Sequence, residues 1–207
     1  MRSSDCARRI LISTWFLAAA MAAHAQALQG AALVQALRHG GYVIAMRHAN
    51  SPMVPPAKDE VNADNLKGER QLDAEGRASA VAMGKALREL KIPIGEVLSS
   101  PTYRALETVK YARLGTAKTT PELGEDASGM QGGSEAQAQW LRDRIKKLPS
   151  GTNTFLITHS GNIKSAFPQV AADVAEGEAL IFGSDGKGGS ALVARVKIDD
   201  WPTLAQK

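Results

Sequence analysis

Three short apolar runs stand out along the chain, and each is followed at once by polar residues typical of turns or helix starts. The runs are residues 42–46, 94–98 and 154–158. Apolar runs of this length, bounded by turn signals, predict buried strands. Between them, apolar residues recur three and four positions apart, which predicts helices. Strands that alternate with helices favour an α/β domain with a mostly parallel sheet.

The same pattern predicts the helices and a closing hairpin. Asp73 is expected to cap the second helix, and Ser100 with Pro101 has the residue types of an N-cap and first turn. Gly40 is expected to end the first helix. The helices are expected at 28–37, 74–91, from 101, at 134–147 and from 161, and two final strands at 179–182 and 191–198. Their buried faces are expected to use Ala78, Val81, Gly84, Leu87 and Leu90, and Trp140, Leu141 and Ile145.

Two long segments, residues 50–72 and 114–133, carry no periodic apolar pattern. The first contains three prolines, and the second is rich in glycine and acidic residues. Loops of this length are uncommon in compact domains unless they are functional. We therefore interpret segment 50–72 as a substrate lid, with a solvated excursion as the alternative.

The N-terminal residues have the pattern of an export signal. Three arginines precede the apolar stretch Ile10–Ala23, which is too short for a membrane span. The tripeptide Ala23-His24-Ala25 matches an A-x-A cleavage signal. We expect a Sec-type signal peptide at residues 1–25, a folded domain at 26–207, and a periplasmic or secreted location. A buried N-terminal helix is the alternative interpretation.

Charge and cysteine content narrow the function further. The 207 residues carry a formal charge of +4, and cleavage after Ala25 removes three arginines and one aspartate, which leaves +2. A charge this small does not favour a nucleic-acid surface, and no membrane association is expected after cleavage. The only cysteine, Cys6, lies inside the predicted signal, so the mature domain has no disulfide and no cysteine metal ligand.

Two arginines and two histidines lie just after the predicted strands. Arg47 and His48 follow the first run, Arg104 follows the second, and His159 follows the third. Ligands of open parallel sheets bind beyond the carboxyl ends of the strands. These four side chains are therefore expected to converge into a compact site for a phosphate dianion.

Each residue type has a distinct role in that chemistry. Arg47 and Arg104 can bind phosphate oxygens bidentately and stay charged, and His159 can add a donor. A neutral His48 can attack phosphorus and form a phosphohistidine. The acid that protonates the leaving group is expected among Glu122, Glu125 and Asp126, with Glu125 favoured. Asn50 is a further candidate for phosphate contact, although asparagine after a strand also suits a turn.

These segments resemble the histidine phosphatase superfamily, in its phosphoglycerate mutase-like branch, across most of residues 30–198. The family's Arg-His-Gly motif appears as Met46-Arg47-His48-Ala49, with alanine in place of glycine. Its serine-serine-proline motif with a following arginine appears at 99–108, and its late histidine motif at 156–162. The resemblance implies a three-layer α/β/α sandwich, His48 as the phosphorylated nucleophile, a phosphate pocket of Arg47, Arg104 and His159, and no metal or other cofactor.

A literal Arg-His-Gly tripeptide also occurs at Arg38-His39-Gly40, but it lies before the first predicted strand, where Gly40 suits a helix end. Two functions stay open. The first is an exported, metal-independent phosphomonoesterase that acts on a small phosphorylated substrate through a phosphohistidine at His48. The second is a phospholigand-binding protein on the same scaffold that has little or no catalytic activity. The physiological substrate and the oligomeric state stay open.

Overall fold

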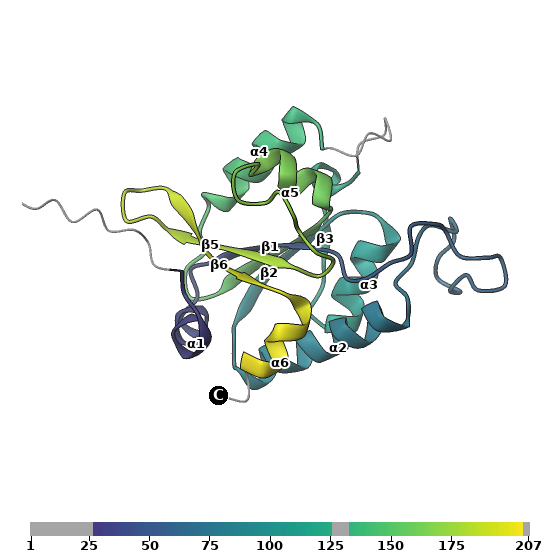
Figure 1. Cartoon of the computed structure of the whole chain (residues 1–207), viewed down its shortest axis with the longest axis horizontal. Helices are drawn as coiled ribbons and strands as arrows, with labels where there is room; N and C mark the ends of the chain where they lie inside the picture. The colour runs from purple at the N-terminus through teal and green to yellow at the C-terminus, as the bar shows by residue number, and fades with distance from the viewer. Residues whose placement is uncertain (1–26, 126–132, 205–207) are drawn as a thin grey trace, which may run out of the picture.

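A computed structural model describes residues 27–125 and 133–204 of the chain, which form a central sheet covered by helices on both faces (Figure 1). The strand order in the sheet is β3-β2-β4-β1-β5-β6. The strands are β1 (Val43–Arg47), β2 (Ile94–Ser99), β3 (Lys118–Thr119), β4 (Asn153–Thr158), β5 (Ala179–Ser184) and β6 (Ser190–Val196).

Helices form the two outer layers. In Figure 1, α4 and α5 lie above the sheet, whereas α1, α2, α3 and α6 lie below it. The helices are α1 (Gly30–His39), α2 (Ala74–Glu89), α3 (Tyr103–Ala112), α4 (Glu135–Ile145), α5 (Ser160–Ala166) and α6 (Trp201–Leu204), with 3₁₀ turns at Pro121–Leu123 and Ile198–Asp200. The predicted three-layer α/β/α sandwich is confirmed. None of the helices in the described residues is long and apolar enough to cross a membrane.

Four neighbouring strands, β3, β2, β4 and β1, run parallel, while β5 and β6 are antiparallel and form the predicted hairpin. Side chains of the central strands alternate between two cores. Ile44 and Met46 belong to the core under α1, α2, α3 and α6, while Val43 and Ala45 belong to the core under α4 and α5. Burial on both faces explains why residues 43–46 of β1 are all apolar.

The parallel pairing brings the carboxyl ends of β1, β4 and β2 level with one another. Arg47 is the register partner of Thr158, and Ser99 is the partner of Ile157. The pairing continues past the strands, because the backbone N–H of His48 donates to the Thr158 carbonyl at 3.0 Å. The residues that follow these three strands are therefore neighbours at one edge of the sheet.

The α2 helix begins as predicted, but its buried face differs from the prediction. The Asp73 side chain accepts a hydrogen bond from the Gly76 N–H at 2.7 Å, which confirms the cap. Gly84, Leu87 and Leu90 are buried as expected, whereas Ala78 and Val81 are exposed. The buried positions Gly76, Ala80, Met83, Gly84, Leu87 and Leu90 follow the helical period from Gly76.

Close contact between α2 and α3 selects that face. A Cβ built on Gly84 would lie 1.8 Å from the Ala112 carbonyl oxygen, so only glycine allows the two backbones to approach this closely. In α4, Leu141 and Ile145 are buried and Trp140 is partly buried against the same core, as predicted.

The start of α3 is a correction to the sequence prediction. The helix begins at Tyr103 with Thr102 as the N-cap, rather than at Pro101 with Ser100 as the N-cap. Ser100 instead uses its hydroxyl in a tertiary hydrogen bond with His159 at 2.9 Å. Arg104 nevertheless lies in the first turn, as expected.

Secondary structure within 114–133 and at the C-terminal end was not predicted. Strand β3 has two exposed residues and depends on pairing with β2. The short α6 helix carries Trp201, which is fully buried in the core that lies between the sheet and α1, α2, α3 and α6.

Candidate functional site

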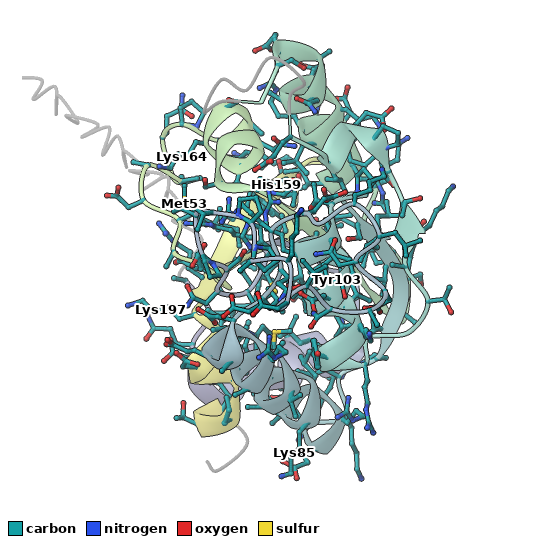
Figure 2. All side chains as sticks on the ribbon, turned by 90° about the vertical axis from the view of Figure 1, so that its right-hand side faces the viewer. Met53, Lys85, Tyr103, His159, Lys164 and Lys197 are labelled. Carbon is teal, nitrogen blue, oxygen red and sulfur yellow. The ribbon has the colours of Figure 1, made fainter. Side chains whose placement is uncertain are left out.

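The predicted site residues converge at the carboxyl edge of the parallel strands. Arg47 ends β1, His48 follows it, Arg104 lies in the first turn of α3, and His159 joins β4 to α5. Figure 2 looks onto this edge of the molecule, with His159 near the middle of the face. The rings of His48 and His159 lie 5.3 Å apart, centre to centre.

His48 is buried in one defined protonation state. Its Nδ1 lies 2.8 Å from the Ala49 carbonyl oxygen, and its Nε2 lies 3.1 Å from Arg104 Nε. A carbonyl only accepts and a guanidinium only donates, so Nδ1 carries the hydrogen and Nε2 carries the lone pair. Burial, together with the charges of Arg104 and Arg47, holds the pKa of His48 well below its usual 6.5. The ring is therefore neutral and its Nε2 is nucleophilic.

His159 is neutral for the same reasons. Arg104 Nη2 donates to His159 Nδ1 at 3.2 Å, so the ring hydrogen lies on Nε2 and is directed to the Ser100 hydroxyl. Burial is the main cause that lowers the pKa of His159 to about 3, followed by the charges of Arg104, Arg70 and Arg47.

Arg104 is the common partner of the other site groups. It is 3% exposed and donates to both His48 and His159. It also forms an ion pair with Glu125. A buried charge needs partners of this kind, because an uncompensated guanidinium would be strongly destabilising.

Arg47 lies beside this group and is held from the segment between α5 and β5. Its Nη1 donates to the Val174 carbonyl at 3.0 Å, and its Nη2 donates to Glu176 at 2.7 Å. Its Nε is buried and has no acceptor among the described residues. A buried donor without a partner costs about 1–3 kcal/mol.

Among the candidate acids that the structure describes, Glu125 is the one with contacts to the other site residues. Its Oε1 contacts Arg104 and lies 3.6 Å from His159 Nδ1, while its side chain is 54% exposed. The segment before it is fixed because Asn162 donates to the Glu122 and Gly124 carbonyls and Thr158 donates to the Leu123 carbonyl. Asp126 lies outside the described residues.

The Asn50 side chain bonds to the residue that caps α2. Its side-chain amide donates to the Asp73 carboxylate at 2.6 Å, next to the start of α2. This contact fits the turn interpretation and gives no support to a phosphate contact.

The alanine that replaces the family's glycine fits its position. Ala49 is fully buried, and its N–H donates to Thr108 Oγ1 at 3.0 Å. Within the described residues, only Lys91 and Arg113 among non-glycine residues have a positive φ. Ala49 therefore adopts a backbone conformation that is ordinary for an L-residue.

The second Arg-His-Gly tripeptide lies away from the site, as expected. Arg38 and His39 end α1, where Arg38 donates to the Leu90 carbonyl and the His39 ring bonds to the Gln35 carbonyl. Gly40 follows with φ of 76°, a conformation that favours glycine.

Two charged residues of the site were not predicted from the sequence. Arg70 comes from the 50–72 segment, where it donates to the Ser51 and Pro52 carbonyls. Its charge acts on His159, and burial and Arg104 lower its own pKa. Glu176 is the other missed residue. Both lie in irregular segments, where no periodic pattern marks a residue for function.

The 50–72 segment lies beside the site and is held by hydrogen bonds to α3. Glu107 accepts hydrogen bonds from the Leu72 N–H and the Asn62 amide, and Glu69 accepts one from the Tyr103 N–H. These contacts hold the segment, and with it Arg70, in one place.

Comparisons with known proteins agree with this geometry. Residues 43–151 match the family model described as the histidine phosphatase superfamily (branch 1). No curated protein matches the sequence significantly.

Several solved structures share the fold. A protein histidine phosphatase SixA complexed with tungstate has a TM-score of 0.53 at 18% identity, covering 77% of this chain and 98% of its own. A putative phosphohistidine phosphatase SixA from Agrobacterium tumefaciens has a TM-score of 0.52 at 14% identity, covering 75% and 97%. A phosphoserine phosphatase mutant from Entamoeba histolytica, in complex with phosphoserine, has a TM-score of 0.51 at 16% identity, covering 76% and 97%. At these identities the likeness concerns the fold alone.

The neutral histidines predict how stability depends on pH. In the unfolded chain, His159 binds a proton below its ordinary pKa of about 6.5. In the folded chain its pKa is about 3, so it stays neutral over most of that pH range. Its contribution to stability is therefore present above pH 6.5 and is lost as the pH falls, at about 1.4 kcal/mol per pH unit. Between pH 6.5 and 5, urea denaturation should show a shallower loss for His159→Gln than for the wild type. Equal slopes would contradict a neutral, buried His159.

Proposed function

The chain belongs to branch 1 of the histidine phosphatase superfamily, and from this membership we propose that it is a metal-independent phosphomonoesterase that acts through a phosphohistidine at His48. The observation that carries the proposal is the state of His48. Its Nε2 lone pair accepts a hydrogen bond from Arg104. The buried ring of His159 lies 5.3 Å away, centre to centre. A neutral nucleophile beside fixed cationic donors is the arrangement that phosphoryl transfer requires.

The site's charges suit a phosphate dianion. Arg47, Arg70 and Arg104 supply three positive charges, and Glu125 and Glu176 supply two negative ones around neutral imidazoles. Phosphate oxygens would accept from the guanidinium groups of these arginines. In this way the chain's own residues can stabilise the equatorial oxygens of the transition state.

The reaction proceeds in two steps. Phosphate first replaces the Glu125 carboxylate beside Arg104, and Glu125 takes up a proton from solvent. His48 Nε2 then attacks phosphorus while the bond to the ester oxygen breaks, and Glu125 gives its proton to the departing alkoxide. Water then attacks the phosphohistidine, the Glu125 carboxylate takes a proton from that water, and the P–N bond breaks. The products are an alcohol and inorganic phosphate, and His48 and Glu125 return to their first state.

We propose a small phosphomonoester as the substrate. The superfamily relatives of similar fold include proteins named for phosphohistidine and phosphoserine. The functional side chains are recessed, since His48, His159 and Arg104 are each less than 5% exposed. A phosphate on a slender group can reach them more readily than one on a nucleic-acid backbone.

The second candidate is a phospholigand-binding protein without turnover. Two ion pairs support it, because they already engage the phosphate-binding arginines: Arg47 pairs with Glu176, and Arg104 pairs with Glu125. Tight binding of phosphate that depends on Arg104, with no turnover of any monoester, would favour this candidate over the enzyme.

The first prediction of this proposal concerns the nucleophile. The mature wild-type protein should hydrolyse p-nitrophenyl phosphate equally well with and without a chelator. A phosphoenzyme should also be trapped, without an acid quench, because phosphohistidine is acid-labile. His48→Ala should lower turnover by at least about 10³-fold, because the covalent path is lost. His39→Ala, which changes the other Arg-His-Gly tripeptide, is the matched control and should retain activity. Equal turnover by His48→Ala and the wild type would refute the nucleophile assignment.

The second prediction concerns the acid. Glu125→Gln should lower kcat by about 10²–10⁴-fold for an alkyl phosphate, whose alkoxide needs a proton. The loss should be much smaller for p-nitrophenyl phosphate, whose leaving group departs without one. Glu122→Gln is the control, because it removes a carboxyl from the same segment and leaves Glu125 unchanged. An equal loss on both substrates would show that Glu125 does not act as the acid.

Export is the last part of the proposal. We propose that residues 1–25 direct the chain through the Sec route and are then removed, although these residues lie outside the described part of the structure. The exported protein should begin at Gln26 when its N-terminus is sequenced, and Ala25→Arg should block cleavage. Recovery of the uncleaved chain in the cytoplasmic fraction alone would contradict export.

A further inference from the structure

A closed ring of hydrogen bonds joins the nucleophile to the phosphate-binding arginine through Thr108, which has no part in the proposed chemistry. His48 Nδ1 donates to the Ala49 carbonyl at 2.8 Å, and the Ala49 N–H donates to Thr108 Oγ1 at 3.0 Å. Thr108 Oγ1 donates to the Arg104 carbonyl at 2.9 Å. Arg104 Nε then donates to His48 Nε2 at 3.1 Å, which closes the ring.

The hydroxyl of Thr108 can satisfy both of its partners only in one orientation. A hydroxyl has a single hydrogen to donate. It is donated to the Arg104 carbonyl, because a carbonyl can only accept a hydrogen bond. A lone pair of the same oxygen is then left to face the Ala49 N–H. Thr108 and Ala49 are both fully buried, so water does not compete for these bonds.

Helix geometry sets the distance between the two ends of the ring. Arg104 and Thr108 are four residues apart in α3, which places them one above the other on the same face. The helix therefore presents the guanidinium to the His48 ring and the hydroxyl to the backbone that follows that ring. The peptide that links His48 to Ala49 is held by Thr108, and its orientation determines where the His48 ring can lie.

We propose that Thr108 is a positioning residue that, by holding the His48–Ala49 peptide against α3, orients the His48 ring and maintains its Nδ1–H form. This inference rests on the proposed function, because it assigns Thr108 to the phosphorylation of His48. The hydrogen-bond partners of the Thr108 hydroxyl are the Ala49 N–H and the Arg104 carbonyl, and the reacting nitrogen of His48 is not among them. Its hydroxyl acts through Ala49, whose carbonyl accepts the Nδ1 hydrogen.

The kinetic test compares Thr108→Ser with Thr108→Ala. The two variants lack the same methyl group and differ from each other only in the hydroxyl. Thr108→Ala should lower kcat for p-nitrophenyl phosphate by about 10–100-fold, the scale of loss that a small misplacement of a reacting group causes, with KM changed by less than about threefold. Thr108→Ser should keep kcat within about threefold of the wild type.

The second measurement does not depend on turnover. A long-range proton–nitrogen NMR spectrum of the ring nitrogens identifies the nitrogen that carries the hydrogen, and the mature chain has only three histidines to assign. The wild type and Thr108→Ser should show His48 in the Nδ1–H form alone. Thr108→Ala should show a mixture of the two neutral forms.

Thr154→Val is the control for the general loss of a buried threonine hydroxyl. Thr154 lies at the opposite end of β4, and its hydroxyl makes only a 3.4 Å contact with Arg144. This variant should keep both the wild-type kcat and the wild-type ring spectrum.

The proposal is overturned if Thr108→Ala keeps the wild-type kcat and a single Nδ1–H form, or if Thr108→Ser is impaired as much as Thr108→Ala. If Thr108→Ala does not fold, the ring spectrum and kcat of Thr108→Ser alone decide, since loss of the Nδ1–H form with the hydroxyl present refutes the role. A wild type that forms no phosphohistidine would refute the proposed function, yet the ring spectra would still support or refute the orienting role of Thr108.

Discussion

The parallel pairing of β1 with β4 is the constraint on which the site depends. It makes Arg47 the partner of Thr158, so that the residues next in the chain, His48 and His159, emerge side by side. Pairing of β2 with β4 then brings Ser99 level with Ile157 and delivers α3 to the same edge. A shift of the register by one residue would exchange the two faces of each strand and separate the groups. The buried apolar side chains on both faces oppose such a shift.

Within this frame, Arg104 organises the chemistry. Its guanidinium donates to both imidazoles, and since it cannot accept a hydrogen, it determines which nitrogen of each ring carries the lone pair. Its charge also helps to keep both rings neutral. The contact with Glu125 compensates the buried charge in the absence of a ligand. A phosphate dianion could take over that compensation, which would release Glu125 toward the leaving group.

Predictions from local pattern succeeded where a residue's role depends on its near neighbours. Asp73 caps α2 because its side chain reaches an N–H three residues away, and Gly40 ends α1 through its own φ. They failed where a distant segment decides. Ser100 has the features of an N-cap, yet its hydroxyl bonds to His159, which is 59 residues away. Val81 is exposed because the close contact of Gly84 with Ala112 turns another face of α2 inward.

The α/β class of the fold and the four residues that meet at one edge of the sheet were predictable from the sequence. These residues are Arg47, His48, Arg104 and His159. These features follow from apolar periodicity and from the rule that parallel strands end at one edge. The positions of Arg70, Glu176 and Thr108 at the site, and the ion pair of Glu125 with Arg104, emerge only in the folded chain. Arg70 and Glu176 lie in irregular segments, and the contact of Thr108 with Ala49 joins residues 59 positions apart. Their proximity to the site results from packing between distant elements, which no local pattern records.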